Sequence, residues 1–448
     1  MTPGARIQAA IEIIEDLEAH PRPADRVLRE WGTAHRFAGS KDRAAIRSHV
    51  FAAFRRRGEA IEAMGASDAR SIMLGSTRIA LGWSPVEIAA SLRGGAYEAP
   101  GVTPTERALL EAAVVRKIIP GALNWPSWLA DKMTAQHAEH AEDLMAALLG
   151  VAPLDLRVNA ALGSREAALE ALRSVGFPAE PTPYSPWGIR VARDADLVGT
   201  NIRALPMFRD GRIEIQDEGS QLAALLSQAR PGEQILELCA GGAGKTLALA
   251  AMTGRAGQIF ACDVDAARLK TGHERVRRAN LHNVQPRHIA EWDPNSGEPD
   301  PDLEELAGKM DLVFLDVPCT GSGAWRRAPD AKWWLKTDEL VALTRTQSAI
   351  LQRGARLVKP GGRLVYVTCS VFAEENAEQI IAFLDRANWQ LADAAAIWRA
   401  AIGGAPPDGT IVEIPGAGAG NMFQLSPLAT HTDGFFIAIL KRAAPNDG

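Results

Sequence analysis

An acid and a thiol follow one apolar run of this sequence closely enough to act at one point. Residues 311–317 have the pattern of a buried strand, with Asp316 near its end and Cys319 just beyond it. Pro318 lacks a backbone N–H, so the strand ends there. Small residues follow (Thr320, Gly321, Ser322 and Gly323), and after them come Trp325 and the basic pair Arg326 and Arg327. This order is typical of an active-site edge facing an anion, although a core strand ending in a turn gives the same pattern.

Alternating strands and helices from residue 231 onward must position this edge. We expect strands at 234–239, 258–263, 284–289, 311–317 and 363–369, helices at 246–252, 266–280, 338–357 and 373–388, and a final strand at 434–440. Such alternation predicts a parallel sheet with right-handed crossovers and helices on both faces. If the sheet is wound outward from its first strand, the fourth strand lies beside the first and the fifth beside the fourth.

A second thiol then lies close to the first. Cys369, within Thr368-Cys369-Ser370, ends the fifth strand, and neighbouring strands are only ~4.8 Å apart. Free cysteines are most often buried packing residues, and Cys262, inside the second strand, fits that description. Two thiols at the carboxyl ends of adjacent strands are harder to explain by packing, so we interpret Cys319 and Cys369 as functional.

The first strand leads into a glycine turn that could hold a nucleotide, Cys239-Ala-Gly-Gly-Ala-Gly-Lys245. A P-loop requires a glycine where Cys239 stands, although Gly244-Lys245-Thr246 fits that motif. The alternative is the adenosine-binding turn of a Rossmann-like methyltransferase, which expects a second acid at the end of the next strand. Asp263 supplies this acid, and its carboxylate can accept both ribose hydroxyls. The methyltransferase interpretation therefore explains more residues.

A thiolate beside a methyl donor is suited to methylation of an unactivated pyrimidine carbon. Carbon 5 of cytosine is a poor nucleophile, but a thiolate that adds to carbon 6 makes it enamine-like and able to attack a methylsulfonium. Asp316 would then stabilise charge at the ring nitrogen. The geometry of the two strand ends leaves open which thiol attacks.

These residues together resemble the RsmB/Sun/NOP family of RNA cytosine-carbon-five methyltransferases. The matching motifs are ELCAGGAGKT (237–246), DVDAARL (263–269), DLVFLDVPCTGSGAWRRAPDAKW (311–333), LVKPGGRLVYVTCSVFAEEN (357–376) and TDGFFIA (432–438). The resemblance implies that Cys369 is the nucleophile and that Cys319 assists release of the methylated base. It also implies an S-adenosylmethionine site made by Cys239, Ala240, Gly241, Gly242, Ala243, Gly244, Lys245, Asp263 and Asp316. Arg326, Arg327 and Lys332 would approach the RNA backbone.

The glycine turn departs from the family pattern. The usual Ala-Pro-Gly-Gly is Gly241-Gly242-Ala243-Gly244 here, and the preceding acid is Glu237 instead of aspartate. The turn is still small and flexible, so we expect cofactor binding to be retained. A further family acid at the end of the third strand has no clean match, and Glu291 is the nearest residue.

The chain before this region predicts two further domains. Residues 1–150 have helical periodicity throughout and resemble a NusB-like RNA-binding domain through ADRVLREW (24–31), KDRAAIRSHVFAAFRRRG (41–58) and NWPSWL (124–129). Residues 151–228 predict a small α+β module, and residues 229–448 the Rossmann-like class I methyltransferase domain. This domain order resembles the bacterial small-subunit ribosomal RNA enzymes of the family, so ribosomal RNA is the expected substrate by analogy.

Composition limits the remaining classes of function. The 448 residues are 47% hydrophobic and 23% charged, which describes a soluble globular protein, and the net charge of −5 argues against indiscriminate coating of nucleic acid. No apolar run approaches the ~18 residues of a membrane span, and the four cysteines lack CxxC spacing. We therefore expect a cytoplasmic monomer without metal or membrane partners. The alternatives are a P-loop NTPase and a non-catalytic RNA-binding ribosome assembly factor.

Overall fold

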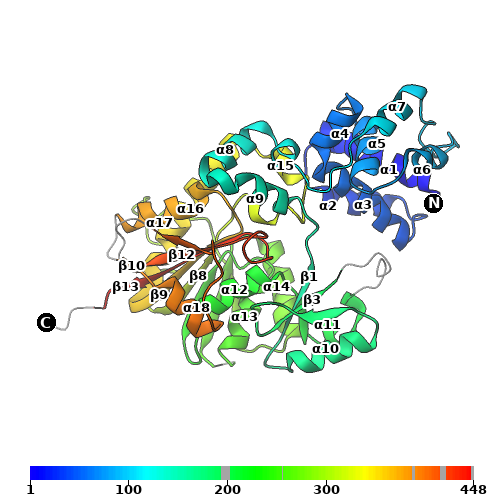
Figure 1. The fold of residues 1–448 in the computed structure, drawn as a ribbon. Helices are drawn as coiled ribbons and strands as arrows, with labels where there is room; N and C mark the ends of the chain where they lie inside the picture. The colour runs from blue at the N-terminus through cyan, green and yellow to red at the C-terminus, as the bar shows by residue number, and fades with distance from the viewer. Residues whose placement is uncertain (193–201, 255, 386–388, 414–419, 445–448) are drawn as a thin grey trace. The chain divides into compact units, whose positions relative to one another are not determined.

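The computed structural model describes residues 1–192, 202–254, 256–385, 389–413 and 420–444. Among these residues the chain forms two compact units (Figure 1). The helical unit comprises residues 1–152 together with 324–336, and the catalytic unit comprises the other described residues. The methyltransferase region was predicted as one continuous domain at 229–448. Within it, residues 324–336 belong instead to the helical unit.

The helical unit is built from short amphipathic helices around one apolar core. The apolar residues that recur at helical spacing in the first helix, Ile7, Ile14 and Leu17, are fully buried in this core. The helices are α1 (Pro3–Ala19), α2 (Ala24–Ala34), α3 (Ser40–Arg55), α4 (Arg57–Met64), α5 (Ala69–Ile79), α6 (Pro85–Ser91), α7 (Pro104–Ala112), α8 (Ser127–His137), α9 (Ala141–Leu148) and, from the separate segment, α15 (Ala331–Trp334).

The small α+β module lies within the catalytic unit and contains a four-stranded antiparallel sheet. Its strands are β1 (Leu154–Val158), β2 (Ala179–Pro181), β3 (Gly188–Val191) and β4 (Ile213–Ile215), in the order β2-β3-β1-β4. Its helices are α10 (Arg165–Ser174) and α11 (Pro206–Arg209). These strands and helices agree with the small α+β module predicted in this part of the chain.

The large sheet of the catalytic unit has the predicted parallel centre. Its order is β11-β12-β13-β9-β8-β5-β6-β7, with β10 paired to β13. The strands are β5 (Gln234–Leu238), β6 (Gln258–Asp263), β7 (Val284–His288), β8 (Met310–Asp316), β9 (Val358–Thr368), β10 (Trp389–Leu391), β11 (Ile411–Glu413), β12 (Asn421–Leu425) and β13 (Phe435–Arg442). Strand β8 pairs in parallel with both β5 and β9, which confirms the expected neighbours. Strand β13 is antiparallel to β9.

Helices cover both faces of this sheet (Figure 1). Helices α12 (Glu218–Leu226), α13 (Gly244–Met252), α14 (Ala266–Arg278) and α18 (Ala394–Ala401) contribute to one apolar cluster, and α16 (Thr337–Leu357) and α17 (Ala377–Leu384) contribute to the other. Alternate residues of β8 face the two clusters. Leu312 and Phe314 belong to the first cluster, and Val313 and Leu315 belong to the second. Because a fully buried side chain of this kind contributes about 1.5–3 kcal/mol, β8 is held strongly from both sides.

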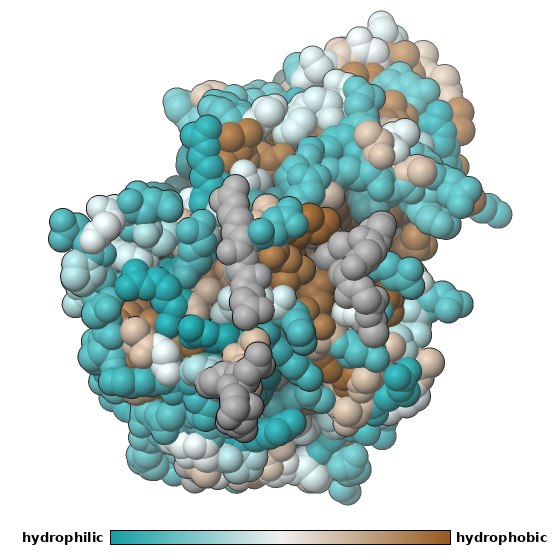
Figure 2. All heavy atoms as spheres, turned by 90° about the vertical axis from the view of Figure 1, so that its left-hand side faces the viewer, coloured by the Kyte–Doolittle hydropathy of each residue, from teal (hydrophilic) through white to brown (hydrophobic). Residues whose placement is uncertain are grey.

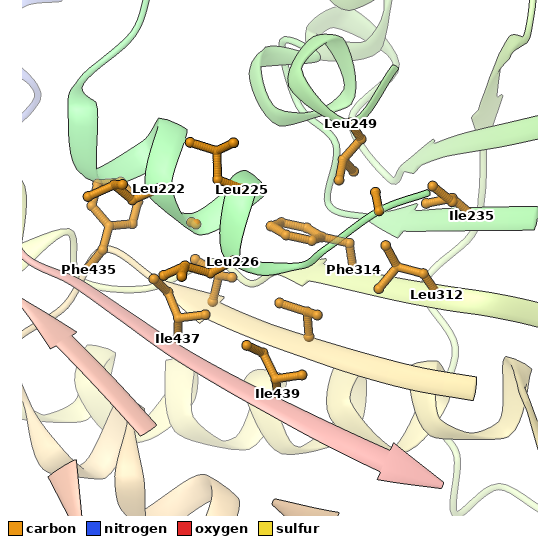
Figure 3. Close-up of a cluster of buried hydrophobic side chains, with 14 of the residues drawn as sticks. Leu222, Leu225, Leu226, Ile235, Leu249, Leu312, Phe314, Phe435, Ile437 and Ile439 are labelled. Carbon is orange, nitrogen blue, oxygen red and sulfur yellow. The ribbon is translucent and has the colours of Figure 1, made fainter. Parts of the chain in front are cut away.

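The first of these clusters joins α12, the helix that precedes the large sheet, to the last strand, β13. Figure 3 shows Leu222, Leu225 and Leu226 of α12 beside Phe435, Ile437 and Ile439 of β13, with Phe314 of β8 in the same cluster. Since β13 pairs with β9, this packing also supports the strand that precedes Cys369.

The structure differs from the prediction in one helix and in three short strands. The helix expected at 373–388 is shortened to α17, because Asn376 leaves the helical backbone region and uses its side-chain amide to bond the carbonyl of Ser370. Residues 386–388 of that prediction lie outside the described residues. The short strands β10, β11 and β12 were not predicted.

Hydrophilic residues cover much of the face seen in Figure 2, and no helix among the described residues is long and apolar enough to cross a membrane.

Candidate active site

The two predicted functional thiols meet at the carboxyl ends of β8 and β9. The Sγ atoms of Cys319 and Cys369 are 3.4 Å apart, and both residues are partly exposed. The contact with Cys369, followed by burial, raises the pKa of the Cys319 thiol well above its ordinary value. Cys319 therefore keeps its proton and can donate it in a hydrogen bond to Cys369.

A fully buried carboxylate, Glu375, holds the two cysteine-bearing loops together. It accepts hydrogen bonds from the backbone N–H of Thr320 at 2.9 Å and from the Thr320 hydroxyl, both on the loop of Cys319. It also accepts one from the hydroxyl of Ser370, next to Cys369. The side-chain amide of Gln347 in α16 donates to Glu375 and to the carbonyl of Pro318, each at 3.0 Å. One carboxylate thus fixes the residues adjacent to both thiols.

Serine hydroxyls and a close backbone approach add to this connection. The Oγ atoms of Ser322 and Ser370 are 2.9 Å apart, and the backbone N–H of Gly323 donates to the carbonyl of Cys369 at 3.0 Å. A Cβ at Gly323 would lie 2.2 Å from the carbonyl oxygen of Gly434, so only glycine fits. The loop after β8 is therefore fixed to both β9 and the start of β13.

The glycine turn is folded around the acid that ends β6. Asp263 is 3% exposed, and its carboxylate accepts from the backbone N–H groups of Gly241 at 2.6 Å and Asp265 at 2.8 Å. Cys239 and Ala243 both have left-handed backbones, with φ of 62° and 58°. Ala243 is the N-cap of α13, so the helix begins where the turn ends. The buried carboxylate of Asp263 thus holds the backbone of the turn in place.

Lys245 and Asp316 form an ion pair that joins the turn to β8. Lys245 Nζ donates to Asp316 Oδ2 at 2.7 Å, and the lysine is buried whereas 31% of the aspartate side chain is exposed. Burial lowers the pKa of Lys245, but the Asp316 carboxylate opposes this, and the net pKa is raised above its ordinary value. Lys245 is therefore a charged donor at the edge where the two thiols lie.

Glu237 of β5 is a buried acid beneath the turn. Thr246 donates its hydroxyl to one carboxyl oxygen, while the other, Oε1, has no hydrogen-bond partner among the described residues. Burial raises the pKa of Glu237 to about 8, even though the Thr246 hydrogen bond opposes the rise. Glu237 is thus mainly protonated at neutral pH and can donate a hydrogen bond.

The basic residues expected to contact RNA belong to the other unit. Arg326 and Lys332 are 6% and 1% exposed within the helical unit, where Lys332 Nζ donates to the carbonyls of Phe54 and Pro329. Both side chains are thus buried within the helical unit, and their approach to the RNA backbone stays a prediction. Arg327 is half-buried, and its role stays a prediction. Glu291 is exposed just after β7, and its contact with a cofactor also stays a prediction.

Glu375 was missed by the sequence reasoning, which treated the AEEN stretch only as part of a family motif. The usable signal was an acid placed a few residues after Thr-Cys-Ser at the predicted start of a helix. Gln347 carried no signal, because a glutamine within an amphipathic helix is usually a solvated residue.

The parallel sheet, the glycine turn and the acid ending β6 together define a Rossmann-like class I methyltransferase. The family model described as 16S rRNA methyltransferase RsmB/F matches residues 224–441, and the RsmF/B-like ferredoxin-like domain matches 125–197. The chain belongs to this RsmB/F methyltransferase family, which decides against the P-loop alternative. The predicted order of a helical region, a small α+β module and a Rossmann-like domain is confirmed.

Curated relatives and solved structures agree with this assignment. The chain is 33% identical to the ribosomal RNA small subunit methyltransferase B of Photorhabdus laumondii over 58% of both chains. It is 33% identical to that of Citrobacter koseri over 70% of this chain and 66% of the other. The matched region thus spans less than two thirds of these relatives.

Two crystal structures share the fold. PH0851 has a TM-score of 0.70 at 22% identity and 99% coverage of both chains. A methyltransferase homolog from Pyrococcus horikoshii has a TM-score of 0.58 at 27% identity, covering 71% of this chain and 95% of the other.

Proposed function

We propose that this protein transfers a methyl group from S-adenosylmethionine to carbon 5 of a cytosine in RNA, with small-subunit ribosomal RNA as the substrate. The observation that carries this proposal is the 3.4 Å contact between Cys319 and Cys369 at the carboxyl ends of adjacent strands. A methyltransferase that acts on a nucleophilic nitrogen has no need of a thiol, whereas methylation of carbon 5 needs one to add and a second group to help its release.

The residues of the glycine turn fit the cofactor. A buried carboxylate at the end of β6 suits ribose hydroxyls, and the turn leads directly into the N-terminus of α13, where helix N–H groups suit a polar ligand. Residues Cys239 to Lys245, with Asp263 and Asp316, would hold it, and when bound it supplies the methyl group as an electrophile.

The thiolate of Cys369 adds to carbon 6 of the cytosine, forming the carbon–sulfur bond and moving the ring electron pair to carbon 5. That carbon attacks the methyl group, so the new carbon–carbon bond forms while the methyl–sulfur bond breaks and the donor would leave as its neutral thioether. A base then takes the proton from carbon 5, the electron pair of that bond restores the carbon 5–carbon 6 double bond, and the carbon–sulfur bond breaks to return the Cys369 thiolate. In this scheme Asp316, paired with Lys245, holds the base at its ring nitrogen, and Cys319 assists the last step.

The raised pKa of Cys319 supports this division of roles. A thiol that keeps its proton while contacting Cys369 is a poor nucleophile but a suitable proton donor or relay. The helical unit would bind RNA, on the strength of its resemblance to NusB-like domains. RNA as a partner and a cytoplasmic location are parts of the same proposal.

The test uses purified protein, methyl-labelled S-adenosylmethionine and small-subunit ribosomal RNA, with nucleoside analysis of the product. We expect label in 5-methylcytidine, and Cys369→Ala should reduce the rate by at least about a thousandfold, as expected for loss of a covalent nucleophile. Cys262→Ala is the matched control, because Cys262 is buried within β6 and burial raises its pKa to about 12. Label in another nucleoside, or an active Cys369→Ala variant, would contradict the proposal.

A further inference from the structure

A groove rich in arginine lies within the catalytic unit, between the small module and α14. Its cavity is about 690 Å³, and its walls come from η4 (Ile202–Ala204), α11, β4 and α14. Its charged lining residues are Arg203, Glu214, Glu274, Arg275, Arg277 and Arg278. We call this cavity the arginine groove. Four guanidinium groups face two carboxylates there, in a chain whose net charge is −5.

One of the two carboxylates is already used within the fold. Glu214 is 3% exposed and bonds both Arg275 and Arg278, so it fixes those two side chains as part of the wall. Arg278 also lies over the ring of Phe208, 4.4 Å from the ring centroid. The exposed Arg277 guanidinium has no hydrogen bond or ion pair with the described residues. The groove therefore has built walls and positive charge left for a ligand.

The arginine groove adjoins the cofactor turn through a single side chain. The guanidinium of Arg275 donates to the carbonyl of Gly242 at 2.5 Å and to Glu214 at 3.0 Å. The same arginine thus belongs to the wall of the groove and supports the glycine turn. A ligand in the groove would lie beside the turn on the side of the small module.

The charge of α14 extends the positive surface beyond the groove. Its exposed residues include Arg268, Lys270 and Arg277, with Glu274 as an acid among them. Cations in the last turn of a helix also stabilise it through the helix dipole. That explanation does not cover Arg203 and Phe208, which reach the same cavity from separate elements.

We propose that the arginine groove binds the sugar-phosphate backbone of the RNA substrate, beside the nucleotide that reaches the thiols. The inference rests on the proposed function and adds a place for the RNA outside the residues of the family motifs. Arginine forks match phosphate oxygens, and such contacts position a nucleic acid without reading its sequence. Arg203 and Arg277 would contact phosphate, while Arg275 and Arg278 keep the wall in place.

The test is the double variant Arg203→Glu/Arg277→Glu in the full-length protein, measured with the same ribosomal RNA. We expect KM for RNA to rise at least about tenfold, and the slope of log K against log salt to fall by about 2, because each removed arginine leaves one phosphate group unneutralised. The rate at saturating RNA and the affinity for S-adenosylmethionine should stay unchanged. The single variant Arg277→Gln, at an exposed position, gives a smaller effect in the same direction and guards against misfolding of the double variant.

Arg399→Glu is the matched control, because Arg399 is also an exposed arginine in the last turn of a helix, α18. Groove variants with the KM and salt slope of wild type, or of Arg399→Glu, would overturn the inference while the methyltransferase proposal stands. A wild-type protein that neither binds nor methylates RNA would overturn the proposed function itself, and with it this inference.

Discussion

Residues 316–323 and 324–336 are consecutive in the chain, yet they belong to different compact units. The first segment follows β8 and carries Cys319, and its backbone and side chains are bonded to the loop of Cys369 through Glu375 and Ser370. The second segment belongs to the helical unit. One motif that seems continuous in the sequence therefore contains two parts with separate structural roles.

The second segment is fixed within the helical unit by hydrogen bonds and ring contacts of its own side chains. Asp330 accepts from the backbone N–H of Ala24 at 2.9 Å, where α2 begins, and Trp333 Nε1 donates to the carbonyl of Phe54 at 2.9 Å. Trp325 packs edge-on against Trp125, with ring centroids 5.2 Å apart. Burial raises the pKa of Asp330 and lowers the pKa of Lys332. The comparison shows that a lysine within a family motif can be buried and bonded within the fold of the helical unit.

Glu375 provides the sharpest test of the first segment. Glu375→Ala should remove the shared acceptor of both loops and lower kcat by roughly a hundredfold or more, since a displacement of about 1 Å near reacting atoms costs that much. Measured S-adenosylmethionine affinity should change little. The rate of Cys369 alkylation by iodoacetamide at a fixed pH should change in the folded variant, because the loop that carries this thiol loses its anchor. An unchanged alkylation rate with unchanged kcat would mean that Glu375 does not position the thiols.

Trp333 tests the second segment. Trp333→Ala should destabilise the helical unit by about 2–4 kcal/mol, because it removes part of an aromatic residue packed on the core and leaves the Phe54 carbonyl without that donor. The rate per folded molecule at saturating RNA should be kept. Phe37→Ala is the control, since that ring is 72% exposed in the same unit. A loss of kcat without a loss of thermal stability would contradict a purely structural role for this segment.

Glu237 gives a third test, which appears as a pH dependence of the stability of the catalytic unit. Its pKa is about 8 in the folded protein against 4.5 ordinarily, so the folded state holds a proton that the unfolded state releases. Stability should therefore fall as pH rises from 4.5 to 8, by up to about 1.4 kcal/mol per pH unit. Glu237→Gln should flatten this dependence in thermal unfolding of the catalytic unit. If the unfolding free energy of the variant has the same slope against pH as that of wild type, a group other than Glu237 causes the dependence.

The sequence was sufficient to predict the strand order and the meeting of the two thiols. Both follow from local rules, because alternating strands and helices give a parallel sheet whose carboxyl ends meet at one edge. The anchoring role of 324–336 could not be predicted in that way, since Lys332 bonds a carbonyl 278 residues earlier in the chain. Lysine and arginine beside glycines have the local pattern of a solvated loop, and only the tertiary contacts show that Lys332 is buried.

The central proposal is that Cys369 attacks the base and that Cys319 assists release of the product. Covalent trapping tests it most directly. Cys319→Ala should still let Cys369 add to the base but should slow release, so a protein–RNA adduct that survives denaturing electrophoresis should accumulate in the presence of S-adenosylmethionine. The adduct should be absent from Cys369→Ala and from the double variant. An adduct formed by Cys369→Ala, or none formed by Cys319→Ala while its methylation proceeds normally, would contradict the account.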